Sequence, residues 1–385
     1  MRVLIIIGIV CFSFSALQAD PISSNERPRG QMMGGAGLAL TGDKDSAMMN
    51  PASLADVEGT DWQLFPVLIE VPFAVDTLQT GLDYNDARDG NDTAAKKAAL
   101  EKFLREAGSS SYRTRMNLYP SYTRRYMHFG LLFDTLADDN FRMGGLGSNQ
   151  LMEAGDTSIT AGAILSGGYG FDNNSIQVGA TLRPMYRVSP FENYDQRVLD
   201  VAAGKNAGSS VQNQIFGNDA AKRTAMGVAV DAGAKYWLQT YGSPADGFYS
   251  RFVKQWKPSF GVTYQDIGNT RVMTDKNLPA DIKQSVSVGM AVQPSWRFVE
   301  TAWALDFRNV TDEKAIWNKL HFGAEALLWK FWAIRAGVSQ GYITGGMGIN
   351  IPFFEMDVYV AAKEAGSYAS IDEVRTIGLR LSLTL

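Results

Sequence analysis

Residues 377–385 read IGLRLSLTL, and this stretch decides the fold class. Every second residue from Ile377 to Leu385 is large and apolar, whereas the residues between them are small or polar and include Arg380. Successive side chains of a β-strand point to opposite faces, so the pattern predicts a strand with one apolar face and one polar face.

The same alternation recurs upstream, for example over residues 176–183, 285–292 and 320–326. Counting such segments gives fourteen expected strands. They cover residues 60–75, 116–123, 127–136, 154–168, 175–188, 223–240, 257–268, 282–293, 299–310, 317–329, 330–340, 342–351, 353–364 and 374–384. Bacterial outer-membrane barrels use an even number of strands of roughly ten residues each, and the expected strands fit that description.

The connections between the expected strands alternate in length. The long ones are residues 76–115, 137–153, 189–222 and 269–281. The short ones include residues 124–126, 169–174 and 294–298. Outer-membrane barrels alternate short periplasmic turns with longer outer loops, so we expect both termini on the periplasmic side. Residues 241–256 break the rule, which indicates either a misplaced strand or an elaborated turn.

Hydropathy separates the possible fold classes. No stretch after residue 19 is long and apolar enough for a transmembrane helix, which needs roughly 20 residues. Without such helices a chain crosses a bilayer only as a closed barrel, because open strand edges find no hydrogen-bond partners in lipid. We therefore predict an all-β fold, an antiparallel transmembrane β-barrel of about 14 strands. A large soluble β-sandwich is the alternative, because its strands also alternate.

The first residues predict export. Arg2 precedes an apolar run over residues 3–14, and small residues lead to Ala19, as in a secretory signal peptide. Cleavage after Ala19 removes Cys11, the only cysteine, and changes the net charge from −4 to −5. A lipoprotein leader is disfavoured, because the bulky Val10 precedes Cys11. The mature chain then offers no disulfide and no Cys ligand, and it has no basic excess for nucleic acid.

The segment before the first strand does not alternate. Residues 20–59 are rich in Gly and other small residues, which allow close packing against other backbones. The dipeptide Asn50-Pro51 is a turn signal. We expect this segment to fold back into the lumen as a hatch, with residues 1–19 as signal peptide and residues 60–385 as barrel.

Motifs in this segment resemble a known family. The run GGAGLAL at 34–40, the acidic and Ser-containing stretch that follows it, and NPA at 50–52 are similar to the N-terminal hatch of the FadL family. These proteins are outer-membrane transporters of long-chain fatty acids and other hydrophobic compounds. In the C-terminal half, residues 320–325, 334–338 and 345–350 resemble the related PorV-like barrels.

The resemblance implies a fourteen-stranded barrel plugged by residues 20–59. Cargo would enter from outside, meet the hatch and leave sideways into the bilayer. The residues of the hatch would be Gly34, Gly35, Gly37, Asn50 and Pro51.

If the apolar strand faces meet lipid, the opposite faces place charged side chains of both signs in the lumen. These are Arg183, Asp231, Lys235, Asp306, Glu325, Arg335, Asp357 and Arg380. Buried charges need partners, so we expect them to brace the barrel and hold the plug. A polar conduction path is the alternative interpretation.

The sequence favours transport of hydrophobic small molecules, such as long-chain fatty-acid-like compounds, across the outer membrane of a Gram-negative bacterium. Met is pliable and tolerates varied ligands, so Met32, Met33, Met48 and Met49 are candidates for a dry ligand pocket; ordinary plug packing is the alternative. A PorV-like scaffold that binds secreted proteins through its outer loops is the second hypothesis. The plug and the mixed charges disfavour an open diffusion pore.

Enzymatic motifs are missing from the sequence. His128 and His321 are the only histidines, and no nucleophile elbow or phosphate-binding loop is present. His321 and Glu325 share a strand face, but four residues separate them along the strand. We predict no enzyme, no metal and no cofactor; the expected partners are outer-membrane lipid, a hydrophobic ligand and, in the second hypothesis, a secreted protein.

Overall fold

The computed structural model describes most of the chain beyond the leader. The described ranges are 27–73, 111–143, 151–190, 222–240, 247–270, 272–273, 282–312, 315–364 and 373–385, with Asp83, Ala95, Ala98, Ala99 and Lys102 besides. The predicted signal peptide, the first residues of the predicted hatch (20–26) and much of the long connections lie outside these ranges.

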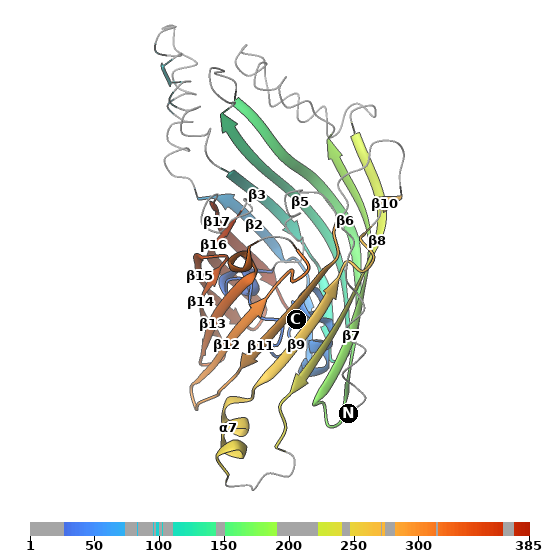
Figure 1. Cartoon of the computed structure of the whole chain (residues 1–385), viewed down its shortest axis with the longest axis vertical. Helices are drawn as coiled ribbons and strands as arrows, with labels where there is room; N and C mark the ends of the chain where they lie inside the picture. The colour runs from blue at the N-terminus through green and yellow to red at the C-terminus, as the bar shows by residue number, and fades with distance from the viewer. Residues whose placement is uncertain are drawn as a thin grey trace.

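One antiparallel sheet makes up the wall of the molecule (Figure 1). Its segments are β1 (Thr60–Gln63), β2 (Val67–Pro72), β3 (Ser111–Leu118), β4 (Ser121–Arg124), β5 (Met127–Met143), β6 (Leu151–Phe171), β7 (Ile176–Pro190), β8 (Lys222–Trp237), β9 (Ser259–Gln265), β10 (Val272–Met273), β11 (Ser285–Val292), β12 (Val299–Phe307), β13 (Leu320–Leu328), β14 (Trp332–Ser339), β15 (Tyr342–Ile351), β16 (Phe354–Glu364) and β17 (Glu373–Leu383). β17 pairs with β2, so the sheet closes on itself. The predicted antiparallel barrel is confirmed.

Seventeen segments form fourteen barrel strands, because three strands are interrupted. β1 and β2 occupy one position, β3 and β4 the next, and β9 and β10 lie together beside β8. Pro66 and Pro120 lie in the first two interruptions, where a residue without an N–H cannot continue the ladder. Each of the fourteen expected strands corresponds to one barrel position. β5 and β6 are longer than expected, since their hairpin extends to Met143 and Leu151.

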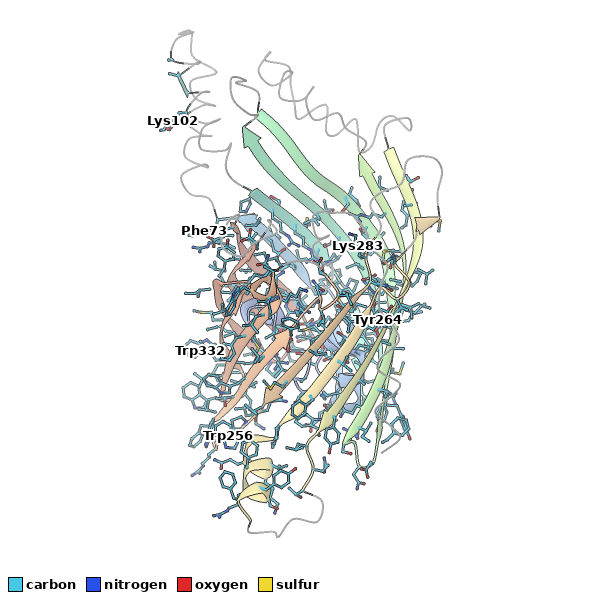
Figure 2. All side chains as sticks on the ribbon, in the orientation of Figure 1. Phe73, Lys102, Trp256, Tyr264, Lys283 and Trp332 are labelled. Atoms are coloured by element: carbon cyan, nitrogen blue, oxygen red, sulfur yellow. The ribbon has the colours of Figure 1, made fainter. Side chains whose placement is uncertain are left out.

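The two faces of the wall have opposite chemistry. On β17, Leu379, Leu381 and Leu383 are exposed, whereas Arg380 and Ser382 are buried on the inner face. Exposed aromatic and aliphatic side chains recur on the outer face of the other strands (Figure 2). The charged side chains are therefore inside and the apolar ones outside, the reverse of a soluble β-sandwich, and the sandwich alternative is wrong.

The irregular connection after β8 contains a helix. α7 (Phe248–Trp256) precedes β9 and lies at the end of the barrel where the short turns gather (Figure 1). Of the two explanations for residues 241–256, the elaborated turn is the correct one.

Residues 27–57, here called the hatch segment, lie between opposite walls of the barrel. They form α1 (Pro28–Met32), α2 (Ser46–Met49) and the 3-10 helix η2 (Pro51–Asp56). α1 contacts β14, β15 and β16, whereas η2 contacts β6, β7 and β8. A segment this short reaches both sides only through the lumen. Among the described residues, no helix has the length and apolar character needed to cross a membrane.

Candidate functional site: the interface between hatch segment and wall

Ten charged side chains connect residues 27–45 of the hatch segment to one sector of the wall. The hatch segment contributes Arg27, Arg29, Asp43, Lys44 and Asp45. The wall contributes Glu325 on β13, Arg335 on β14, Glu355 and Asp357 on β16, and Arg380 on β17. We call this set the ion-pair network. It contains five bases and five acids, with a net charge of +1 on the hatch side and −1 on the wall side.

Arg380 is the wall residue with the most partners in this network. Its guanidinium lies 2.5 Å from Glu355 Oε1, 2.7 Å from Asp357 Oδ2 and 3.2 Å from Asp45 Oδ2. Arg27 Nε approaches the other oxygen of Asp45 at 3.0 Å. Asp45 of the hatch segment is thus held between one arginine of its own segment and one of the wall.

Arg29 makes the second link between the two parts. Its Nη2 lies 2.7 Å from Glu325 Oε1, and its Nη1 lies 2.7 Å from Asp43 Oδ2. Arg335 continues the chain of charges, since its Nε is 2.6 Å from Glu325 and its Nη1 is 3.0 Å from Asp357. Cross-strand register explains the wall side, because Glu325 faces Arg335 and Asp357 faces Arg380 in neighbouring strands.

These contacts keep the hatch charges ionised. Burial alone would raise the pKa of Asp45, but the positive charges of Arg380 and Arg27 hold it well below its ordinary value. Burial would lower the pKa of Arg29, but Glu325 and Asp43 raise it above its ordinary value. Each charge therefore depends on its partner in the lumen.

The glycine turn of the hatch segment is held by backbone contacts. Asp306 Oδ2 accepts hydrogen bonds from the backbone N–H of Gly37 at 2.7 Å and of Leu38 at 3.0 Å. His321 Nδ1 lies 2.6 Å from the carbonyl oxygen of Gly34. Gly34 has a φ of 66° and Gly37 a φ of 148°, backbone conformations that glycine adopts without strain.

Residues 40–56 of the hatch segment are bonded to β8. Lys235 Nζ donates to the carbonyl of Leu40 at 2.9 Å and to Ser53 Oγ at 3.1 Å, and it also contacts Asp56. Asn50 Oδ1 accepts from the N–H of Ala52 at 3.1 Å, which caps η2. The predicted turn at Asn50-Pro51 therefore begins η2, with the proline at its first position.

Inward-facing glycines give the hatch backbone room against the wall. This glycine belt comprises Gly168, Gly179, Gly233, Gly261, Gly289, Gly323 and Gly337. Several belt members pair directly across strands: Gly168 with Gly179, Gly179 with Gly233, Gly261 with Gly289, and Gly323 with Gly337. A Cβ at Gly179 would lie 2.4 Å from the carbonyl carbon of Pro51, and one at Gly323 would lie 2.3 Å from the carbonyl oxygen of Met33. Side chains at these positions would displace the hatch segment.

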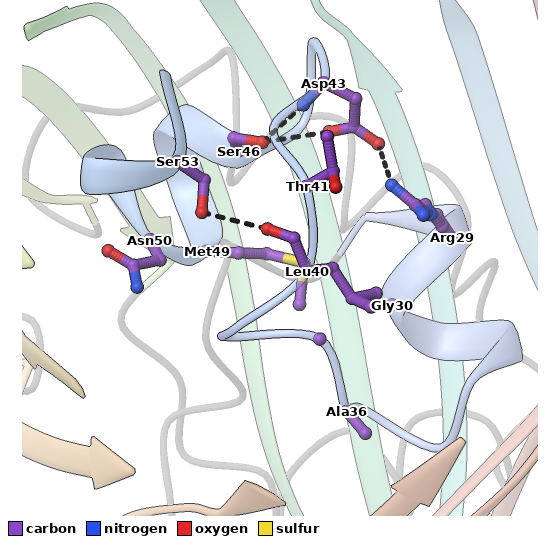
Figure 3. A pocket seen from close by; sticks show the side chains of 11 residues that line it. Arg29, Gly30, Ala36, Leu40, Thr41, Asp43, Ser46, Met49, Asn50 and Ser53 are labelled. Carbon is purple, nitrogen blue, oxygen red and sulfur yellow. Dashed lines mark hydrogen bonds and ion pairs between the residues drawn. The ribbon is translucent and has the colours of Figure 1, made fainter. Parts of the chain in front are cut away.

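A small polar cavity lies within the hatch segment (Figure 3). The centre of a water molecule can occupy about 20 Å³ of it, which is space for roughly one water. Arg29, Asp43 and Ser53 line it, and the close-up shows Arg29 reaching Asp43 and Ser53 pointing to the carbonyl of Leu40. Sites for small molecules usually measure roughly 300–1,000 Å³, so this cavity cannot hold a hydrophobic cargo molecule in the state observed.

The four methionines predicted for a ligand pocket do not share one cavity. Met49 lines the polar cavity. Met32 packs with Tyr359, Met33 lies beside small residues of β11 and β12, and Met48 packs with Tyr119. These are plug-packing contacts, and the ligand pocket stays a prediction.

A second cavity lies between the hatch segment and β2, β3, β16 and β17. Gln31, Glu70, Arg113 and Lys363 are among its lining residues. Arg113 is buried and its Nε lies 4.0 Å from Oε2 of Glu70, whereas its Nη2 and Oε1 of Gln31 have no hydrogen-bond partner. Unpaired buried donors are costly, and the centre of a water molecule can occupy about 10 Å³ here, so the cavity is suited to one water that accepts from Arg113 and donates to Gln31.

The predicted lumen charges all lie on the inner face of the wall. Besides those already described, Arg183 Nη2 is 2.9 Å from Asp231 and 3.0 Å from Asp266. Their pairing supports the bracing interpretation. His128 bonds with Tyr119 and Thr123. In the part of the chain that the structure describes, no cluster of three or more His, Cys, Asp or Glu is suited to a metal ion.

Comparisons with known proteins find similarity in structure alone. No family model matches the chain, and no curated protein matches it. A solved monoaromatic hydrocarbon channel, CymD, is 13% identical, with 93% of this chain and 96% of that chain covered at a TM-score of 0.49. The Ralstonia pickettii toluene transporter TbuX is 14% identical, with 93% and 97% covered at 0.46.

A Pseudomonas aeruginosa FadL homologue is 9% identical, with 96% of this chain and 98% of that chain covered at a TM-score of 0.35.

The glycine belt gives a first test. A Cβ at Gly168 would lie 2.7 Å from the carbonyl oxygen of Pro51, whereas one at the adjacent, outward-facing Gly167 would meet nothing closer than 3.8 Å. We expect Gly168→Val to speed hydrogen–deuterium exchange of the amides in residues 50–57 by about tenfold or more, because the valine side chain displaces η2 from the wall. Gly167→Val is the matched control and should leave exchange unchanged. Equal exchange in the two variants would show that the glycine belt does not hold η2 in place.

The ion-pair network gives a second test. Arg380→Met leaves three buried carboxylates without their shared partner, and we expect the free energy of unfolding to fall by about 3–5 kcal/mol. Arg375 lies on the same strand but pairs with Glu373 at the exposed surface, so Arg375→Met should cost about 0–1 kcal/mol. Urea unfolding in lipid vesicles measures both values, and a loss at Arg380 no larger than at Arg375 contradicts the importance of the network.

Proposed function

We propose that this chain is an outer-membrane transporter that moves hydrophobic small molecules through a barrel closed by residues 20–59. One observation carries the proposal: the hatch segment contacts opposite sides of the wall, and the cavity within it has space for about one water molecule. A barrel with this interior is closed in the state observed, so passage requires the hatch segment to shift.

The chemistry of the interface suits such a shift. Much of the contact consists of ion pairs and hydrogen bonds, including those of Arg29, Lys235 and Arg380. Water can replace these partners when the segment moves, whereas the apolar contacts of Met32, Met33 and Met48 cost about 25 cal/mol for each Å² that becomes exposed.

An outer-membrane location follows from the same proposal. The outer face carries exposed apolar residues such as Phe133, Met347 and Leu381. An apolar surface of this extent is stable when lipid surrounds it. The predicted signal peptide would direct export, and the short-turn end with α7 would face the periplasm.

Long-chain fatty-acid-like molecules are the cargo that the hatch motif favours. The cavity beside Arg113 does not narrow this choice, because it has space for no more than about one water molecule and the carboxylate of Glu70 already lies 4.0 Å from Arg113. The PorV-like scaffold stays a prediction, because the loops on which it depends lie mostly outside the described residues.

Uptake of two labelled compounds tests the proposal in vesicles that contain the protein. We expect oleate and toluene to enter these vesicles faster than vesicles that lack the protein, because the barrel admits hydrophobic molecules when the hatch segment shifts. A labelled disaccharide is the control and should stay outside, because the hatch segment closes the lumen to hydrophilic solutes. No entry of either compound, together with a protein partner that co-purifies in native mass spectrometry, would replace the transporter with the scaffold.

A further inference from the structure

α7 leaves an aromatic stripe uncovered at the short-turn end of the barrel. Phe248, Phe252 and Trp256 follow one another at intervals of four residues, so they lie on one side of the helix. Phe248 is 83% exposed, and the other two are 36% exposed. Large aromatic residues on an exposed helix need an apolar partner.

Contacts on other sides of α7 attach the helix to the barrel. Val253 and Ser250 are its buried residues. The backbone N–H of Gln293 donates to the carbonyl of Trp256 at 2.7 Å, and the hydroxyl of Tyr249 donates to the carbonyl of Gln239 at 2.9 Å. The helix is thus attached to the wall through one side, and its aromatic stripe faces away from that attachment.

Charge identifies the surface that would cover the stripe. Arg251, Lys254 and Lys257 are exposed on and next to the helix, and residues 248–257 contain no acid. A helix with aromatic residues on one side and bases on another is the pattern of helices that lie in a membrane interface. The bases attract the anionic headgroups, and the aromatic rings enter the boundary of the acyl chains.

Neighbouring turns continue the same surface. Trp296 and Phe298 lie in the turn between β11 and β12, and Trp329 lies in the turn between β13 and β14; all three are more than half exposed. Figure 2 shows Trp256 at this end of the barrel. The stripe of α7 therefore extends an aromatic rim that the strands already form at one end of the apolar outer face.

We propose that α7 is an interfacial anchor that binds anionic phospholipid headgroups of the leaflet at the short-turn end of the barrel. The proposal rests on the membrane location proposed above, and it does not depend on transport or on its cargo. In this arrangement the side chain of Phe252 lies in lipid, whereas that of Lys254 reaches the aqueous headgroup layer.

Spin labels measure both positions. The chain beyond the predicted signal peptide has no cysteine, so Phe252→Cys, Lys254→Cys and Met347→Cys each carry one nitroxide. Met347 is exposed on the outer face of β15 and reports whether the barrel itself is inserted. In vesicles of phosphatidylcholine and phosphatidylglycerol, we expect the ratio of oxygen to nickel-chelate accessibility at 252 to approach that at 347. It should exceed the ratio at 254 by about threefold or more.

Removing the bases tests the headgroup contact. In the same vesicles, Arg251→Gln with Lys257→Gln should lower the ratio of immersed to water-exposed label at 252 by about fivefold for each base removed. In vesicles of phosphatidylcholine alone the pair of substitutions should have no effect. An equal loss in both kinds of vesicle would overturn the assignment of anionic headgroups as the ligand.

Two further results would overturn the proposal and are distinguishable. A label at 252 that is as water-exposed as at 254, while 347 is immersed, shows that the barrel is in the membrane but that α7 does not enter it. A label at 347 that is also water-exposed shows that the membrane location itself is wrong.

Discussion

The pairing of charges across the lumen is the constraint on which the rest of the structure depends. A closed barrel with an apolar exterior must turn its polar side chains inward, and each ionised group there needs a partner. The wall alone does not supply a balanced set, because Arg380 and Arg335 face three carboxylates in the ion-pair network. The hatch segment completes the set with one excess positive charge. Its position in the lumen therefore follows from electrostatics as much as from chain connectivity.

Steric fit acts together with this electrostatic fit. The glycine belt removes side chains from the wall at the places where the hatch backbone passes, from Pro51 near Gly179 to Met33 near Gly323. Backbone groups then come close enough to bond with Asp306, Lys235 and His321. A segment that fits the glycine belt and is held by charges moves when water replaces its charged partners and when Met32, Met33 and Met48 leave their apolar contacts. This combination links the architecture of the lumen to the proposed transport.

The alternation of residues was sufficient to predict the wall. A strand has a side-chain period of two, so residues such as Leu379 and Arg380 are assigned to opposite faces without knowledge of their neighbours. The partners of the charges were not predictable in the same way. Arg29 and Glu325 are almost three hundred residues apart, and only closure of the barrel and the path of the hatch segment bring them together. Glycines at inward positions were visible in the sequence. That they lie next to one another in neighbouring strands is known only once the strand register is known. The spacing of Phe248, Phe252 and Trp256 was also present, although residues 241–256 stood out only as an irregular connection.

Locking the hatch segment to the wall tests the central claim most directly. Arg29 and Glu325 meet at 2.7 Å, and the chain beyond the predicted signal peptide has no cysteine. Arg29→Cys with Glu325→Cys therefore places two thiols where a short, cleavable bis-methanethiosulfonate can bridge them. The account predicts that bridging stops uptake of hydrophobic cargo and that reduction restores the rate of the unbridged variant, while each single-cysteine variant treated with the reagent continues to transport. Uptake at an unchanged rate through the bridged protein would contradict the account, because cargo would then pass without any displacement of the hatch segment.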